Sequence, residues 1–453
     1  MSGPEVITLG CRLNAAESEA MRALAGAEDD LIIVNSCAVT NEAVRQTRQA
    51  IRKAKRARPE ARVVVTGCAA QVEPETFAAM PEVARVVGNA EKFDLPSFQR
   101  RLEPQRVKSS ATNPAGAPAF AGATVSDIFA VPQIAPHLVT GFSTRARAFV
   151  EVQNGCDHRC TFCIIPYGRG NSRSVPAGLV VERVKTLVGQ GLPEVVLTGV
   201  DVTSYGPDLP GSPTLGLLVE RILKHVPELP RLRLSSLDCI EIDGRLEDLI
   251  AHEPRFMPHL HMSFQAGDDL VLKRMKRRHS RAEAVATVAR LKGRRPELAI
   301  GADLIAGFPT ETDEMHENSV RLVEECDIVM GHIFPFSPKR GTPAARMPQV
   351  DPAVVKERAR RLREACARRK SAWLQGMVGT RQRVLVEKDG SGHAENFAPV
   401  HLRHPRESGG PACCSGPALE ETKRDSRFRG NDGEVVEALI TAVDNGTLVG
   451  IPA

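Results

Sequence analysis

The chain of 453 residues contains no long hydrophobic run and no secretory leader pattern. No apolar stretch approaches the about 20 residues that a membrane helix needs. The first residues also lack the basic and then apolar order of a signal sequence. These absences argue against a membrane-bound or secreted class and predict a cytoplasmic protein with no membrane partner. The hydrophobic share of 42% and the charged share of 25% are typical of globular domains, and the length suits two or three of them.

The sequence also lacks the even, regular set of cysteines that marks a disulfide framework. Its 11 cysteines are odd in number and unevenly spaced, which favours metal ligation in a reducing compartment. Cys156, Cys160 and Cys163 form a C-x3-C-x2-C loop directly after a strand-like run. Thiolates at this spacing suit an iron–sulfur cubane, in which three ligands leave one iron open to a substrate or cofactor. Zinc is the alternative, with His158 as a fourth ligand, although structural zinc usually takes two paired ligand clusters.

Residues 1–103 are predicted to form a doubly wound parallel α/β domain. Short apolar runs at residues 6–9, 31–34 and 63–65 alternate with helical patterns. Thr40 is placed to cap the helix between the second and third runs, which ends before Pro59.

Three more cysteines, Cys11, Cys37 and Cys68, follow these three runs. The carboxyl ends of parallel strands lie at one edge of a sheet, so the three side chains can converge on one point. A single buried cysteine is more often a small hydrophobe. A cysteine after each of the three strands favours a set of metal ligands instead. The spacing alone does not exclude a zinc site.

The rest of the chain is predicted to form a linker and two further domains. Residues 104–141, which begin with a stretch rich in Ala, Pro, Gly and Ser, are predicted as a linker. Residues 142–373 repeat strand and helix six times, fewer than the eight units of a closed barrel, which predicts an open, partial (β/α)6 barrel. The candidate strands are residues 149–153, 194–201, 231–238, 259–265, 300–305 and 329–336.

Polar residues at the carboxyl ends of these strands are predicted to line the active face of the partial barrel. Each of them alone could simply cap a helix. The five residues expected to line a cofactor and substrate cavity are Thr198, Asp201, Ser236, Gln265 and Asp303.

Residues 374–453 are predicted to form a small β-barrel, because short strands such as 382–387 and 435–443 follow a basic helix that ends near Trp373. Barrels of this kind bind nucleic acid, and a packing or dimerisation barrel is the alternative. A polar, Gly-rich segment at about 403–433 interrupts the pattern and is predicted as an inserted, disordered surface loop. Cys413 and Cys414 within it would then be bystanders.

Three basic clusters could neutralise the phosphates of an RNA, and a solvated helix face is the alternative for each. They comprise Arg45, Arg48, Arg52, Lys53, Lys55, Arg56 and Arg58; Lys273, Arg274, Lys276, Arg277 and Arg278; and Arg358, Arg360, Arg361, Arg363, Arg368 and Arg369.

Several segments resemble the radical S-adenosylmethionine (SAM) methylthiotransferase family, and the resemblance covers nearly the whole chain. They are residues 9–14, 34–40, 65–69, 148–174, 197–206, 233–238, 259–269, 275–280 and 334–342. The resemblance implies that Cys156, Cys160 and Cys163 hold a 4Fe-4S cluster that binds and cleaves SAM. It also implies a second 4Fe-4S cluster on Cys11, Cys37 and Cys68 that carries sulfur, and a TRAM-like RNA-binding barrel at the C-terminus.

Within this family, residues 201–206 and 265–269 are most similar to the branch that acts on N6-threonylcarbamoyladenosine beside the tRNA anticodon and forms its 2-methylthio derivative. The implied partners are tRNA, a flavodoxin-like or ferredoxin-like reductant, and a sulfur source. Sister enzymes that act on isopentenyl adenosine in tRNA, or on an aspartate of a ribosomal protein, share the six cysteines. A non-catalytic iron–sulfur sensor that binds RNA is the alternative from another class.

Overall fold

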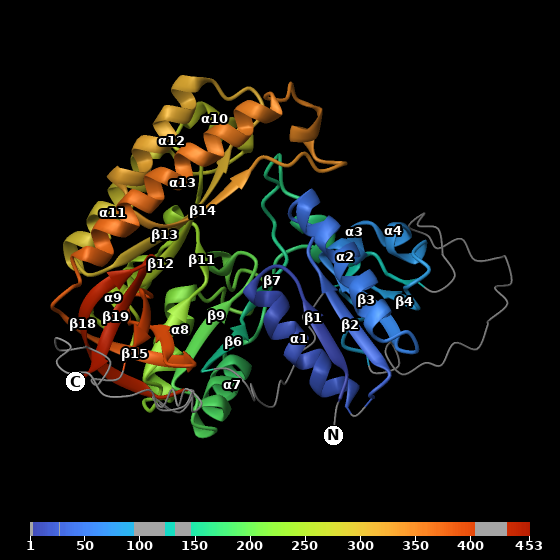
Figure 1. The fold of residues 1–453 in the computed structure, drawn as a ribbon, viewed down its shortest axis with the longest axis horizontal. Coiled ribbons are helices and arrows are strands. Elements are labelled where there is room, and N and C mark those ends of the chain that lie inside the picture. Colours follow the sequence, from blue (N-terminus) through green and yellow to red (C-terminus); the bar gives the residue numbers. More distant parts are fainter. Residues whose placement is uncertain (1–2, 27, 95–122, 132–145, 404–432) are drawn as a thin grey trace, which may run out of the picture.

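The computed structural model describes residues 3–26, 28–94, 123–131, 146–403 and 433–453 (Figure 1). Three units follow one another along the chain. An N-terminal α/β unit lies beside a central sheet that is covered by helices, and a small barrel carries the C-terminus (Figure 1).

The N-terminal unit is a parallel sheet with the strand order β1-β2-β3-β4-β5. Helix α2 packs on Ile32, Val34 and Val63, and helix α1 packs near Leu31 and Ile33 on the opposite face. Because both faces are covered, β2 is buried along its whole length. The elements are β1 (Glu5–Thr8), α1 (Arg12–Ala25), β2 (Leu31–Ser36), α2 (Asn41–Ala57), β3 (Arg62–Gly67), α3 (Cys68–Val72), α4 (Pro74–Ala78), β4 (Arg85–Val87) and β5 (Ala123–Thr124).

The structure confirms the predicted cap of α2 and shortens the predicted linker. Thr40 accepts a hydrogen bond from the backbone N–H of Ala43 (3.1 Å), and α2 ends at Ala57. Strand β5 comes from within residues 104–141 and pairs with β4, so the N-terminal sheet continues past residue 103. Two residues show no alternation, so the sequence carries no signal for β5. Residues 104–122 and 132–141 lie outside the described part of the chain.

The central unit has the six expected strand positions, all in parallel pairs, arranged as β6-β9-β10 and β11-β12-β13-β14. The sheet stays open between its edge strands β6 and β14, which confirms the partial barrel. The strands are β6 (Arg147–Glu151), β9 (Glu194–Thr198), β10 (Arg231–Leu234), β11 (Ser236–Leu237), β12 (His259–Gln265), β13 (Ala299–Ala306) and β14 (Ile328–Pro335), with a small pair β7 (Gln153–Asn154) and β8 (Arg173–Ser174).

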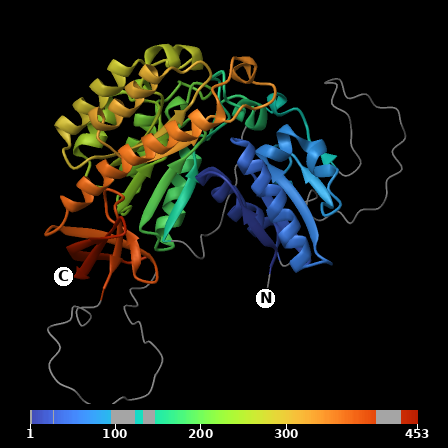
Figure 2. The same cartoon turned by 45° about the horizontal axis from the view of Figure 1, so that its top comes forward.

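Helices cover the outer face of this sheet (Figures 1 and 2), and α13 leads from the region of β14 to the C-terminal barrel. The helices of the central unit are α6 (Ile165–Arg169), α7 (Ala177–Gly189), α8 (Leu215–His225), α9 (Gly244–His252), α10 (Asp269–Met275), α11 (Arg281–Arg294), α12 (Asp313–Glu325) and α13 (Pro352–Gln375), and α6 packs on α3 instead of on the outer face. Among the described helices, none combines the length and the apolar composition required to cross a membrane.

The C-terminal unit is a closed barrel of order β15-β16-β17-β19-β18, as predicted. Its strands are β15 (Arg381–Lys388), β16 (Ser391–His393), β17 (Pro399–Leu402), β18 (Val435–Asp444) and β19 (Thr447–Pro452). It docks on the amino ends of the central strands, where Arg147 pairs with Glu387 (2.6 Å) and Arg233 donates to the carbonyl oxygen of Glu395 (2.7 Å).

The predicted insertion, with Cys413 and Cys414, falls almost entirely on residues 404–432, outside the described residues. Both flanks are bonded to the barrel: the N–H of Arg403 donates to Gly450 and that of Gly433 to Val386 (2.9 Å each). The five strands therefore close the barrel without this segment.

Replacing residues 404–432 by a short Gly-Ser linker should leave the iron content and the expected tRNA affinity within about twofold of the wild-type values, because the five described strands already close the barrel. Iron analysis and filter binding would measure both. A second variant, in which a Gly-Ser segment of the original length replaces the insertion, controls for loop length. A tenfold loss of affinity in both variants would show that the native segment contacts RNA.

Candidate functional site

The structure brings together the three N-terminal cysteines at the carboxyl edge of the sheet. Cys11 precedes α1, Cys37 follows β2 and Cys68 begins α3. Gly10 has a positive φ of 99°, and a Cβ at this position would lie 3.0 Å from the Sγ of Cys37. Glycine therefore permits the close approach of this loop to the thiol. Burial, together with the neighbouring Cys68 thiol, raises the pKa of Cys37 to about 12.

The second set of cysteines lies on the loop between β7 and α6. The loop is held by backbone hydrogen bonds from Cys156 to Gly170 and from Thr161 to Met275, both 3.1 Å. The guanidinium of Arg277 lies 3.9 Å from the Sγ of Cys160. Burial is the main cause that raises the pKa of Cys163 to about 12.

The zinc alternative corresponds to a specific group in the structure. Cys156, His158 and Asp201 offer ligand atoms within 4.8 Å of one another. His158 Nε2 is already paired with Asp201 at 2.8 Å. A zinc ion on this group would leave out Cys160 and Cys163, whereas a cluster would use all three thiols of the loop.

Helix α6 carries the loop of Cys156, Cys160 and Cys163 against Cys68 of the N-terminal cysteine set. The Nε of Arg169 donates to the Sγ of Cys68 at 3.2 Å, and a Cβ on Gly168 would lie 3.2 Å from the Cβ of Cys68. The two sets of three cysteines therefore flank one short helix. The sequence carries no periodic signal that could reveal this contact between domains.

Arg169 belongs to a buried charged network that joins the two units. It pairs with Glu17 (2.7 Å) and donates to the Oδ1 of Asn14 (2.6 Å), and Lys92 pairs with the same Glu17 (2.7 Å). Burial alone would raise the pKa of Glu17, but Arg169 and Lys92 lower it to about 2.

The five predicted cavity residues lie in β9, β11, β12 and β13 or shortly after β9. Asp201 lies 3.9 Å from the Sγ of Cys156 and, of the five, is the one with a polar contact to a described cysteine thiol. Thr198 is buried at the end of β9, and Gln265 ends β12 with a positive φ of 67°. Ser236 lies in β11 beside His261, and Asp303 accepts a hydrogen bond from His261 (2.9 Å).

Charged residues inside the barrel were missed at the sequence level. Glu194 pairs with Arg147 (2.8 Å) and Arg233 (3.0 Å), and Arg231 lies 3.4 Å away. The signal was the alternation of charged and apolar residues along residues 231–234, which places the charged side chains on one face.

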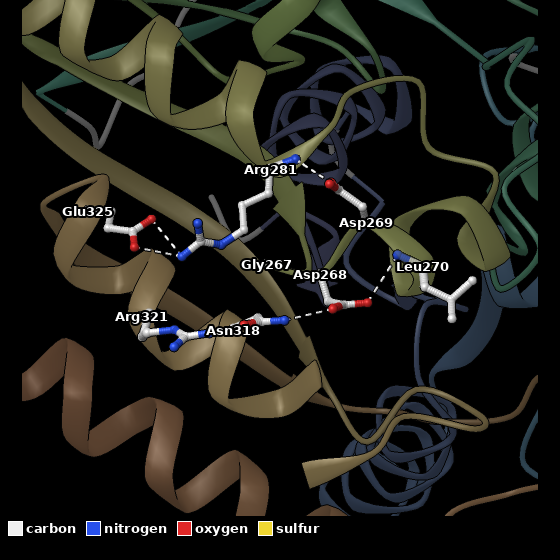
Figure 3. Close-up of a pocket in the computed structure, with 8 residues that line it drawn as sticks. All are labelled: Gly267, Asp268, Asp269, Leu270, Arg281, Asn318, Arg321 and Glu325. Atoms are coloured by element: carbon white, nitrogen blue, oxygen red, sulfur yellow. Dashed lines mark hydrogen bonds and ion pairs between the residues drawn. The ribbon is translucent and has the colours of Figure 1, made fainter. Parts of the chain in front are cut away.

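The pocket in Figure 3 is a separate, polar depression beside α10, α11 and α12. Its charged side chains are satisfied within the protein, since Arg281 pairs with Glu325 (2.6 Å) and Asn318 donates to Asp268 (2.8 Å). No cysteine lines it, so it is distinct from the predicted site. Its lining residues are Gly267, Asp268, Asp269, Leu270, Arg281, Asn318, Arg321 and Glu325.

Comparison with known proteins agrees with this arrangement. Residues 150–323 match the Radical SAM superfamily, and residues 5–88 match the uncharacterized protein family UPF0004. The partial barrel with its cysteine loop therefore defines a radical SAM protein.

The chain is 49% identical over 401 residues to the threonylcarbamoyladenosine tRNA methylthiotransferase MtaB of Rickettsia prowazekii, covering 88% of this chain and 91% of that protein. It is 34% identical to the MtaB of Aquifex aeolicus, with 89% and 97% covered. It is also 31% identical to the tRNA-2-methylthio-N(6)-dimethylallyladenosine synthase of Paracoccus denitrificans, with 84% and 85% covered. The chain belongs to the radical SAM methylthiotransferase family, as the sequence resemblance indicated.

Proposed function

We propose that this enzyme converts N6-threonylcarbamoyladenosine beside the tRNA anticodon to its 2-methylthio derivative. The observation that carries the proposal is the pair of three-cysteine sets on either side of α6, bridged by Arg169. A single set would suffice to cleave SAM, whereas a second set beside it provides a place for sulfur. The choice of substituent follows the names of the MtaB relatives, which reach 49% identity.

The residues present fit two 4Fe-4S clusters. Cys156, Cys160 and Cys163 hold one cluster, which also binds SAM, and Cys11, Cys37 and Cys68 hold the other. The buried thiols lose their protons when iron binds. The guanidinium of Arg169 on the Sγ of Cys68 then supplies positive charge beside an anionic cluster. When bound, the clusters and SAM supply the radical chemistry and the sulfur.

The protein's own contribution is to enclose the interior of the partial barrel and to position SAM and the substrate there. Helix α1 packs on the edge strand β6. At the other edge, Asn41 receives a hydrogen bond from Lys339 and donates to Ser337 and Pro338, each at 3.1 Å. The N-terminal unit thus contacts both open edges of the partial barrel and shields its interior from water. Thr198, Asp201, Ser236, Gln265 and Asp303 are proposed to line the SAM and substrate cavity.

The proposed tRNA surface includes α2 and the residues after α10. Arg48, Lys53, Lys273 and Lys276 form no ion pair within the described chain, so they are available to phosphates. The α13 cluster is largely neutralised, because Arg358, Arg360, Arg361 and Arg369 are paired with carboxylates. For α13, a solvated helix face is therefore a better interpretation than an RNA-binding surface. A reductant and a sulfur source complete the proposed partners, and cytoplasm is the proposed location.

In a strain without this gene, tRNA should contain N6-threonylcarbamoyladenosine but lose its 2-methylthio derivative, and the wild-type gene should restore it. Mass spectrometry of tRNA nucleosides measures both, and the methylthio form of isopentenyl adenosine serves as the internal control. Loss of that second nucleoside instead would support the sister activity. If the tRNA nucleosides are unchanged and the reduced protein forms no 5′-deoxyadenosine from SAM, the results would support the alternative of a non-catalytic iron–sulfur sensor.

A further inference from the structure

One face of β12 and β13 is polar and points into the barrel. His259 and His261 alternate with Leu260 and Met262, and the latter two belong to the core beneath the outer helices. On β13, Gly301 and Asp303 occupy the same face as the two histidines. Gly301 provides the space for the imidazoles, because a Cβ on it would lie 2.6 Å from the Nδ1 of His261.

Asp303 fixes two imidazoles at this face. Its Oδ1 lies 2.9 Å from the Nε2 of His261 and 3.3 Å from the Nδ1 of His332, and the two ring centroids are 4.6 Å apart. His332 is paired with Asp303 in the register of β13 and β14, and its side chain is 62% exposed. Its Nε2 has no hydrogen-bond partner in the described part of the chain, so it can contact a ligand.

The positive charge of Arg12 lies near this polar face of β12 and β13, and it has no anionic partner among the described residues. The neighbouring Arg147 and Arg233, in contrast, are both paired with Glu194. The guanidinium of Arg12 lies 5.5 Å from the ring of Phe397 and forms no hydrogen bond or ion pair with the described residues. Arg12 is half-buried, and the guanidinium groups of Arg147 and Arg233 lie over the same ring.

A partly desolvated cation with no partner favours the binding of an anion. The threonylcarbamoyl group carries one carboxylate and one hydroxyl, whereas a dimethylallyl group carries no polar atom. Arg12 follows Cys11 of the N-terminal cysteine set directly in the chain.

We infer that Arg12 binds the carboxylate of the substituent on N6 of the target adenine, and that His332, oriented by Asp303, contacts its hydroxyl. This inference rests on the proposed function and names the residues that select the substrate. A substrate without the carboxylate would leave the Arg12 guanidinium desolvated and unpaired. A site built in this way rejects an apolar substituent strongly.

The test uses fluorescent anticodon stem-loop RNAs and the full chain, with affinity measured by anisotropy without SAM. One RNA carries N6-threonylcarbamoyladenosine, a second carries the same group with its carboxylate converted to an amide, and a third carries dimethylallyl adenosine. Wild-type protein should bind the carboxylate RNA about 10- to 100-fold more tightly than the amide RNA. Arg12→Met and Arg12→Gln should lose this difference, and Arg12→Lys should retain part of it.

The matched control is Arg22→Met on the same helix, since Arg22 is 42% exposed and pairs only loosely with Glu19 (3.6 Å). It should keep the full preference for the carboxylate. His332→Ala should weaken binding of the carboxylate and amide RNAs by the same factor, because both retain the hydroxyl. The iron content of every variant is measured, so that loss of a cluster is not mistaken for loss of recognition.

The outcomes separate the inference from the proposed function. If wild-type protein methylthiolates the threonylcarbamoyl RNA but binds the amide RNA equally well, the inference is overturned and the function stands. A carboxylate preference that persists in both Arg12→Met and Arg12→Gln also overturns it. Methylthiolation of the dimethylallyl RNA alone would overturn the proposed function itself.

Discussion

Replacing Cys11, Cys37 and Cys68 together by alanine is expected to lower the iron content from about eight to about four atoms per chain. The variant should still cleave SAM to 5′-deoxyadenosine and should form no methylthio product. The physical reason is that these thiols belong to the N-terminal unit, while the set proposed to cleave SAM is held by its own loop between β7 and α6. Iron analysis and chromatography of the nucleosides measure the three quantities on protein prepared without oxygen.

The reciprocal variant, with Cys156, Cys160 and Cys163 replaced by alanine, should lose the other half of the iron and all SAM cleavage. Cys366→Ala is the control, because Cys366 is buried in the hydrophobic core and lies apart from both sets. It should retain all iron. Loss of SAM cleavage in the first variant would contradict two independent clusters, and a full iron content there would exclude these cysteines as ligands.

Replacing Arg169 by methionine should destabilise the protein without clusters by about 3–5 kcal/mol, because a buried ion pair would lose one partner. Glu17 would retain Lys92 alone, and Cys68 would lose the nearer of its two hydrogen-bond donors and keep Asn89 at 4.0 Å. Urea unfolding measures the change. Electron paramagnetic resonance of the loaded, reduced protein should show an altered signal from the second cluster, since hydrogen bonds to sulfur tune such clusters.

The same variant should change how stability depends on pH. The native pKa of Glu17, about 2, lies below its ordinary value of 4.5. The ionised form of Glu17 therefore stabilises the fold at pH values above 4.5. This contribution disappears as the pH falls from 4.5 towards 2. Arg169→Met should weaken this dependence.

Two further variants separate the buried pair from a general loss of charge. Arg245→Met removes an exposed partner of Glu220 and should cost at most about 1 kcal/mol. Adding Glu17→Gln to Arg169→Met should destabilise the protein further, because Lys92 would then be a buried cation that has lost its carboxylate partner. If Arg169→Met and the wild-type protein had equal free energies of unfolding, the contacts of Arg169 between the two units would contribute nothing to stability.

The amino-acid sequence by itself determined the three units and the six candidate ligands. Parallel strands place all their carboxyl ends at one edge, so a cysteine after each of three strands predicts convergence without coordinates. The helix capped by Thr40, the six-unit partial barrel and the small closed barrel follow from local periodicity and turn chemistry, and the structure confirms them. The local pattern also predicted five polar cavity residues at the ends of the central strands. Of these five, Asp201 is the one that contacts a described cysteine thiol.

Tertiary structure alone decided how the units meet. Strand β5 is too short to carry a pattern, and it became visible only through its pairing with β4. Arg169 reaches Cys68 across 101 positions of sequence, and Arg12 reaches Phe397 of the C-terminal barrel. Periodicity records which face of its own element a side chain occupies. The partner that this face meets depends on how distant elements pack. That packing produces the contact of Arg169 with Cys68, and it leaves Arg12 without an anionic partner among the described residues.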